Sequence, residues 1–231
     1  DWTLDFCDQL KRRKLEFTWQ LPSGTRSEAL DHDTLTALYQ TGCRLITYAP
    51  ESGSERTLKL IKKKLKLPRI TERIRMAKRI AHNVKINLVV GFPDERLTDV
   101  LKTMWYALKM AFWGADDCNI SIFSPYPGSE LYERLRKENR IPYPDDEYIA
   151  SLLVYFDLTK SVSYCENVSG RTLAFCRLVV YLLFYPTAYL VYPKRIVRLI
   201  RGLTRSTFKP ANVFEQRMYD IYARNKRQTA A

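Results

Sequence analysis

The order of apolar and polar positions predicts strands that alternate with helices in the first 140 residues. Residues 15–21 alternate apolar and polar side chains with period two, which is typical of a strand. Three further strands are predicted at residues 44–49, 84–90 and 119–123, each followed by a loop that contains Pro. Helical spacing predicts helices at residues 3–14, in the segment that ends at Gly42, at 54–64, 70–81 and 97–113, and after residue 129. Such alternation indicates parallel α/β structure, either a barrel or an open sheet.

The alternation stops after about residue 145. Residues 173–192 are mostly apolar, with one charge at Arg177 and one proline at Pro186. As a helix this stretch would be roughly 30 Å long, enough to cross a bilayer. We therefore divide the chain into an α/β part, residues 1–145, and a helical, basic and apolar extension, residues 146–231.

Positive charge is concentrated in the extension. The 231 residues have a formal net charge of +13 and a pI near 9.5. Residues 161–231 hold twelve Lys/Arg and three Asp/Glu, a net of +9, so residues 1–160 carry only +4. The apolar and charged fractions, 46% and 27%, are those of a globular protein and exclude wholesale disorder. A basic surface of this kind favours an anionic partner.

Three interpretations of residues 173–209 stay open at this stage: contact with an anionic membrane surface, a buried helical cap on the α/β part, and a membrane-spanning helix. An RNA-contacting patch is a less favoured interpretation of the same charge. The run from Lys194 to Lys209 has six bases and no acids, which suits anionic headgroups. The five cysteines are widely spaced, and residues 1–20 lack the apolar run of a signal peptide. We therefore expect a cytoplasmic protein, with peripheral membrane contact as one of these interpretations.

The histidines and cysteines indicate neither a metal site nor a hydrolytic triad. His32 lies between two aspartates and is expected to be an exposed neighbour of a helix cap. His82 is expected at a helix end, where the helix dipole would stabilise its charge. Cys43 and Cys118 flank strands and are expected to be buried.

Polar loops follow all four predicted strands, and in parallel α/β folds such loops carry the chemistry. In chain order they include Thr25-Arg26-Ser27-Glu28, Ala49-Pro50-Glu51-Ser52-Gly53, Gly91-Phe92-Pro93-Asp94-Glu95 and Pro125-Tyr126-Pro127-Gly128. As an ordered set, the loops resemble the latter part of a radical SAM domain. The resemblance covers roughly residues 1–140 and is greatest to the class that often carries an N-terminal cobalamin-binding domain.

The resemblance implies a fold, a set of cofactors and a reaction. The fold is a partial (βα)6 TIM-like barrel, of which this sequence holds the latter four strands. The cofactors are S-adenosylmethionine (SAM), a [4Fe–4S] cluster and, in the class named above, cobalamin. The cluster, reduced by an electron donor, cleaves SAM to a 5′-deoxyadenosyl radical that serves hydrogen abstraction or methyl transfer.

The family's cluster-binding motif, CxxxCxxC, does not occur in this sequence. Two accounts follow. In the first, the chain is a fragment that begins after the motif, so that the cluster ligands lie outside it. In the second, it is a cluster-free homologue.

The resemblance also assigns roles to residues that would bind SAM. It places Glu51 at the ribose, Lys63 at the carboxylate and Asn87 close to the ribose, and it includes Ser52, next to Glu51, among the cofactor-binding residues. Each has a structural alternative. Glu51 could cap the following helix, Lys63 could lie on a solvated basic face, and Asn87 could form a hydrogen bond within the core.

The adenine and substrate ends of the site are assigned in the same way. Gly91 and Pro93 would shape the turn beside the adenine, since glycine permits a close backbone approach. Ile122 and Phe123 would flank the adenine, or else form plain barrel core. Arg26 would bind an anionic group of the substrate or orient SAM, with a salt bridge to Glu28 or Asp31 as its alternative.

Three functions are consistent with these observations. The first is a radical SAM enzyme that acts on a small hydrophobic or lipid-like substrate. The second is a non-catalytic membrane-surface or adaptor module derived from such a barrel. The third is a tRNA-modifying radical SAM enzyme, although nucleic acid is the least favoured partner. The sequence assigns no catalytic residue and no metal ligand.

Overall fold

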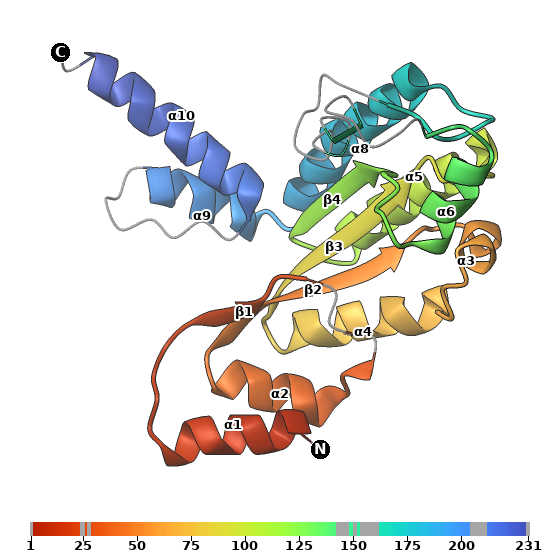
Figure 1. Ribbon diagram of the computed structural model, residues 1–231. Coiled ribbons are helices and arrows are strands. Elements are labelled where there is room, and N and C mark those ends of the chain that lie inside the picture. Colours follow the sequence, from red (N-terminus) through yellow and green to blue (C-terminus); the bar gives the residue numbers. More distant parts are fainter. Residues whose placement is uncertain are drawn as a thin grey trace.

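A parallel sheet forms the centre of the molecule, shown in Figure 1 as a computed structural model. The structure describes residues 2–23, 26, 29–141, 148, 149, 152, 162–203 and 212–229. In this part of the chain four parallel strands lie in the order β1-β2-β3-β4. Their bounds are β1 (Trp19–Leu21), β2 (Cys43–Glu51), β3 (Asn83–Val90) and β4 (Asp117–Ile122). The predicted mixed α/β fold with four parallel strands is confirmed, whereas their place as the latter four strands of a barrel stays a prediction.

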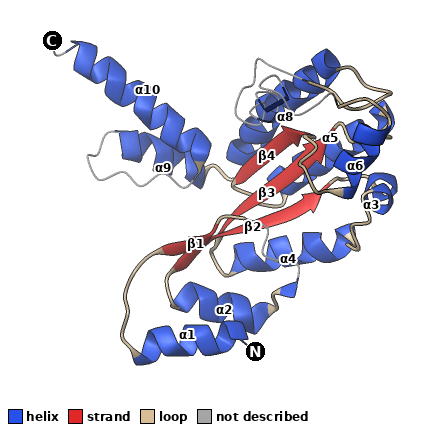
Figure 2. Ribbon diagram, in the orientation of Figure 1, coloured by secondary structure: helices blue, strands red, loops and turns tan. Residues whose placement is uncertain are grey.

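The helices surround this sheet, and α9 and α10 stand apart at one end (Figure 2). The α/β part holds α1 (Trp2–Arg12), α2 (His32–Gln40), α3 (Glu55–Leu60), α4 (Leu67–Arg79), α5 (Leu97–Phe112) and α6 (Glu130–Lys137). The C-terminal helices are α8 (Gly170–Val191), α9 (Lys194–Leu203) and α10 (Val213–Thr229). Several begin at the caps that the sequence provides. Asp31 accepts a hydrogen bond from the Thr34 backbone N at 2.9 Å, and Ser54 caps α3 in the same way.

The two faces of the sheet differ in polarity. Along β3, alternate side chains from Val84 to Val90 are fully buried and pack against α4 and α5. The intervening side chains point to the other face and include Lys85 and Asn87. Parallel sheets in α/β proteins are usually apolar on both faces. A polar face in such a sheet therefore suits the interior of a ligand-binding barrel.

Helix α8 covers the free edge of β4. The Tyr181 hydroxyl accepts a hydrogen bond from the Ile120 backbone N at 3.3 Å and donates one to the Ile120 carbonyl at 3.4 Å. On the same side of the helix, Leu173 and Phe184 are fully buried in the main core. The helix thus satisfies edge groups that would otherwise be open to pairing. The boundary between residues 145 and 146 lies outside the described residues, so the two-part division stays a prediction.

Among the described helices, only α8 is long and apolar enough to cross a membrane, judged by length and composition. One such helix is weak evidence, because the core helix of a soluble protein passes the same test.

Arg195 anchors the last two helices at the amino end of β4. Its guanidinium is buried and pairs with Asp116 at 2.8 Å, while also donating to the Gly114 carbonyl at 2.7 Å. Asn212, which precedes α10, donates to the Asp116 carbonyl at 3.0 Å. These additional hydrogen bonds help to offset the free-energy cost of burying the Arg195–Asp116 ion pair.

Two local predictions are wrong. The strand predicted over residues 15–21 is shorter, because Leu15 and Phe17 stay about half exposed and only β1 pairs with β2. His82 lies just past the end of α4, as predicted, but it is not charged. Its ring is fully buried, and burial lowers its pKa. The Nε2 atom lies 2.9 Å from the Leu35 carbonyl oxygen, so His82 joins α2 to the core as a neutral side chain.

Candidate functional site

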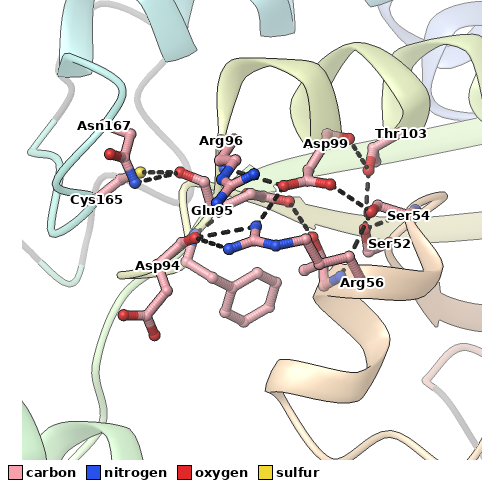
Figure 3. Close-up of polar contacts among 12 residues, drawn as sticks. Ser52, Ser54, Arg56, Asp94, Glu95, Arg96, Asp99, Thr103, Cys165 and Asn167 are labelled. Carbon is pink, nitrogen blue, oxygen red and sulfur yellow. Dashed lines mark hydrogen bonds and ion pairs between the residues drawn. The ribbon is translucent and has the colours of Figure 1, made fainter.

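The loops that follow β2, β3 and β4 lie at the same edge of the sheet, because the strands are parallel. Polar contacts tie the loop after β2 to the loop after β3, and both to α5 (Figure 3). This network therefore positions the loops that carry Ser52 and Gly91, two of the residues assigned to SAM.

Glu51 and Lys63 lie together at the end of β2. The Lys63 Nζ atom is 3.1 Å from Glu51 Oε1, and both side chains are partly exposed. Glu51 has a φ of 66°, an uncommon conformation for a residue with a side chain. The alternative that Glu51 caps α3 is wrong, since Ser54 is the cap. The two residues assigned to opposite ends of SAM are thus neighbours, and their ligand roles stay predictions.

Ser52 lies behind the site and not on its surface. Its hydroxyl is fully buried, 2.9 Å from the Thr103 Oγ1 atom of α5, and it accepts the Ser54 backbone N–H at 3.0 Å. Between them, Gly53 approaches α5 so closely that a Cβ atom would lie 2.4 Å from the Cβ of Tyr106. The geometry gives Ser52 a positioning role, and its predicted contact with a cofactor stays a prediction.

Asp99 and Arg56 continue this network toward the loop after β3. Asp99 accepts hydrogen bonds from the Ser54 hydroxyl at 2.7 Å and from Arg56 Nη1 at 2.6 Å. Arg56 also donates to the Asp94 carbonyl from both terminal nitrogens, at 3.1 and 3.2 Å. These charged hydrogen bonds hold the pKa of Asp99 below its usual value despite burial. Figure 3 shows Arg56 bridging the two loops.

Glu95 stabilises the loop after β3 through hydrogen bonds from its buried side chain. Its carboxylate is fully buried and accepts hydrogen bonds from the Gly91 backbone N at 2.6 Å and the Thr57 hydroxyl at 3.0 Å. Burial raises its pKa to about 7, against the lowering effect of these hydrogen bonds. The sequence shows Glu95 only as the last residue of a loop motif. The spacing of four residues between Gly91, which ends the strand, and Glu95 is the feature of the sequence from which this contact could have been predicted.

The segment from Tyr164 to Leu173 covers the same loop. The Cys165 Sγ and the Asn167 Nδ2 both donate to the Glu95 carbonyl, at 3.2 and 3.1 Å. The Glu166 backbone N donates to the Pro93 carbonyl at 3.0 Å. The C-terminal extension therefore helps to fix the turn that the resemblance places beside the adenine.

Gly91 is required at this turn for two reasons. Its φ is +86°, and an added Cβ would lie 2.5 Å from Leu173 Cδ1. The predicted adenine neighbours occupy different environments. Ile122 is buried in the main core, whereas Phe123 is partly buried and contacts Phe92 with ring centroids 5.0 Å apart. Contact of either residue with adenine stays a prediction.

Asn87 carries an unusual buried group. Its Oδ1 atom is inaccessible to solvent and has no hydrogen-bond partner among the described residues. Asn87 lies on the polar face of β3, directly beside Asn119 of β4. A buried amide oxygen without a partner costs about 1–3 kcal/mol, so its presence calls for a ligand or a bound water. The predicted position near a ribose suits this atom, because ribose hydroxyls are donors.

Arg26 is described, whereas residues 24, 25, 27 and 28 are not. Of its two alternative partners, Glu28 lies outside the described residues, and Asp31 caps α2. The assignment of Arg26 to an anionic substrate group stays a prediction.

The residues present do not fit an iron–sulfur cluster. Across the described ranges, no group of three or more His, Cys, Asp or Glu side chains could hold a metal. All five cysteines are buried, free and dispersed. Burial raises the pKa of Cys43 to about 11, which disfavours the thiolate that a cluster needs. The nucleoside and carboxylate ends of SAM, by contrast, fit the orphaned Asn87 oxygen and the Glu51–Lys63 pair.

Comparison with known proteins gives sequence relatives for the α/β part. The chain is 27% identical to an uncharacterized methyltransferase of Pyrococcus horikoshii, over 56% of this chain and 27% of the relative. It is 30% identical to the cytidylyl-2-hydroxyethylphosphonate methyltransferase of Streptomyces wedmorensis, over 52% and 23% of the two chains. It is 26% identical to the tRNA-2-methylthio-N(6)-dimethylallyladenosine synthase of Thermus thermophilus, over 61% and 30%. The chain thus spans less than a third of the length of these relatives.

No protein-family model matches the chain. Among solved structures, coproporphyrinogen III oxidase of Escherichia coli, described as a radical SAM enzyme, covers 69% of this chain and 38% of its own, with a TM-score of 0.47 and 13% identity. The cobalamin-dependent SAM radical enzyme OxsB covers 98% and 35%, with a TM-score of 0.44 and 14% identity. The predicted resemblance is borne out by the sequence relatives, of which two are named methyltransferases and one a tRNA-2-methylthio-N(6)-dimethylallyladenosine synthase.

Proposed function

We propose that this chain forms the SAM-binding side of the barrel in a radical SAM enzyme. The observation that carries the proposal is the buried Asn87 oxygen without a partner, on the polar face of β3. It lies on the strand that leads to the Gly91 turn, and Glu51 and Lys63 follow the neighbouring strand. A ligand with hydroxyl donors and a carboxylate would satisfy all of these groups.

Each of these residues has a distinct part in binding. Asn87 and Glu51 accept hydrogen bonds from the ribose hydroxyls, and the Lys63 ammonium pairs with the carboxylate of the methionine moiety. The Gly91–Pro93 turn, held by Glu95, receives the adenine beside Phe123. Because Glu95 ties the turn to α3 and to the Tyr164–Leu173 segment, the ligand is oriented and shielded from water.

When bound, SAM supplies the methyl or 5′-deoxyadenosyl group of the reaction. Two of the relatives are named methyltransferases, which favours methyl transfer. We propose a small hydrophobic or lipid-like substrate, on the strength of the apolar extension beside the site, with Arg26 as its anion-binding residue. The ligands of a cluster, and the binding sites of an electron donor or of cobalamin, would have to come from outside the described residues.

Titration calorimetry tests the proposal by measuring SAM binding to the wild type, Asn87→Ala and Asn83→Ala. Asn83 is a matched control because it is an asparagine at the amino end of the same strand. We expect Asn87→Ala to weaken binding about tenfold, as loss of one buried hydrogen bond implies. Asn83→Ala should bind as wild type does.

Two outcomes would contradict the proposal. In one, folded wild-type protein binds no SAM at millimolar concentration, which would favour a non-catalytic module. In the other, both variants bind SAM equally well. Circular dichroism on each variant would confirm that it is folded.

A tRNA-modifying enzyme is a second candidate. One relative is named as a tRNA-modifying synthase, and the net charge of +13 suits a polyanion. Gel retardation of tRNA at low salt tests this candidate, and failure to retard tRNA would count against it.

A further inference from the structure

One side of α8 presents apolar side chains to solvent along most of its length. Phe175, Leu178, Leu182 and Leu190 are each between 51% and 75% exposed. Their spacing of three, four and eight residues places them on one face of the helix. The opposite side of α8, including Leu173 and Phe184, is fully buried in the core. The helix is therefore apolar on both sides, although only one side has a partner among the described residues.

Positive charge lies at both ends of this exposed face. Arg171, one turn before Phe175, is exposed, and Lys194 is exposed at the start of α9. We call the set Arg171, Phe175, Leu178, Leu182, Leu190 and Lys194 the α8 face. Apolar side chains flanked by bases are typical of helices that lie in a membrane interface.

The surrounding sequence has charge of one sign only. Residues 167–214 contain no Asp or Glu. The same segment holds eight bases, namely Arg171, Arg177, Lys194, Arg195, Arg198, Arg201, Arg205 and Lys209. Arg177 and Arg195 are buried, and Arg198 pairs with Glu215. Among the described bases of this segment, Arg171, Lys194 and Arg201 are exposed, so complementary charge on a partner is negative.

The next helix continues the amphipathic pattern. In α9, Val197 and Ile200 are exposed, whereas Arg195 is buried in its ion pair with Asp116. This pair fixes the start of α9 against the amino end of β4. The basic helix is thus held at the end of α8 by a specific contact.

Two alternatives to a membrane surface on the exposed side of α8 fit the observations less well. A second copy of the chain, paired through this face about a twofold axis, would bring bases together with no acid from residues 167–214 to offset them. A spanning orientation would expose the Tyr181 hydrogen bonds to β4 and the buried Leu173 side to lipid. A flat anionic surface suits both the apolar stripe and the bases.

We propose that the α8 face docks the protein on the surface of an anionic membrane. Helix α8 lies along the interface with its core side still packed on α5 and β4. The apolar stripe enters the headgroup region, and Arg171 and Lys194 pair with lipid phosphates. This proposal does not depend on SAM binding, so the two can fail separately.

Vesicle sedimentation of the full chain tests the proposal. The probes are phosphatidylcholine vesicles with and without about 30% phosphatidylglycerol, at low and high salt. The apolar variant is Phe175→Ser with Leu182→Ser. Its control is Leu101→Ser with Trp105→Ser, two side chains of α5 that are 50% and 64% exposed. The charge variant is Arg171→Gln with Lys194→Gln, and its control is Lys59→Gln with Lys102→Gln.

We expect wild type to sediment with the anionic vesicles at low salt, and to be released by salt or by omission of phosphatidylglycerol. The apolar and charge variants should each bind about tenfold more weakly, and both controls should bind as wild type does. Absence of binding to anionic vesicles would overturn the proposal, as would equal losses in variants and controls. A dimer in analytical ultracentrifugation that Phe175→Ser with Leu182→Ser dissociates would also overturn it, in favour of a second copy.

Discussion

The Glu95 carboxylate accepts a hydrogen bond from the backbone N–H of Gly91 at 2.6 Å. The contact spans four residues and closes the turn at the end of β3. The same carboxylate holds α3 through the Thr57 hydroxyl. A single buried acid therefore joins the turn proposed to receive adenine to the loop that carries Glu51.

This contact predicts a stability profile that depends on pH. Burial raises the pKa of Glu95 from 4.5 to about 7, so the folded protein binds this proton more tightly than the unfolded chain does. The contribution of protonated Glu95 to the free energy of unfolding is fully present below about pH 4.5. It is lost as the pH rises through about 7. The change amounts to about 3 kcal/mol in the free energy of unfolding. Urea unfolding at several pH values between about 5 and 8 measures it.

The variant Glu95→Gln should remove this dependence. Its amide is neutral throughout and can still accept the Gly91 N–H and donate to Thr57. Glu55→Gln, at an exposed position on α3, is the control and should keep the wild-type profile. If Glu95→Gln also loses stability between these pH values, another group is responsible.

The turn itself gives a second prediction, tested by a pair of glycines. Gly91 and Gly128 have nearly the same φ, +86° and +85°, but only Gly91 would place a Cβ against Leu173. Both alanine substitutions should cost about 1–2 kcal/mol from backbone conformation. Gly91→Ala should cost about 1–3 kcal/mol more because of overpacking. The measurement is urea unfolding of both variants.

The double variant Gly91→Ala with Leu173→Ala separates the two contributions. Removal of the Leu173 methyl groups should relieve the overlap, so the double variant should be more stable than the sum of the single effects. Strict additivity would show that Leu173 does not pack against Gly91.

The Glu51–Lys63 pair predicts a separation of binding from stability. Lys63→Gln should weaken SAM binding about tenfold, since one charged hydrogen bond is lost. It should change the free energy of unfolding by less than about 1 kcal/mol, because partly exposed ion pairs contribute little. Titration calorimetry and urea unfolding give the two values.

The neighbouring Lys62 is the control. It pairs with Glu130 at 2.7 Å, away from Glu51, and both partners are exposed. Lys62→Gln should leave SAM binding unchanged. Equal loss of binding in both variants would indicate a general effect of basic charge and contradict a specific role for Lys63.

Several features could be predicted from the sequence because local residues specify them. The strands β2, β3 and β4 come from short apolar, β-rich runs that end in Pro- or Gly-containing loops. Helix α2 begins after Asp31, whose side chain can cap only the residues next to it. The resemblance of the loops likewise rests on short motifs. Backbone sterics and hydrogen bonds over a few residues are sufficient for such predictions.

The tertiary structure decided which of these groups meet. Tyr181 covers the Ile120 edge across 61 residues, and Ser52 meets Thr103 across 51. Burial of Glu95 and His82, and thus the shifts of their pKa values, likewise depends on helices that arrive from elsewhere in the chain. The sequence by itself determined the elements and the candidate ligands. Packing between distant segments decided their exposure, pairing and charge, because desolvation and hydrogen bonding act between neighbours in space and not along the chain.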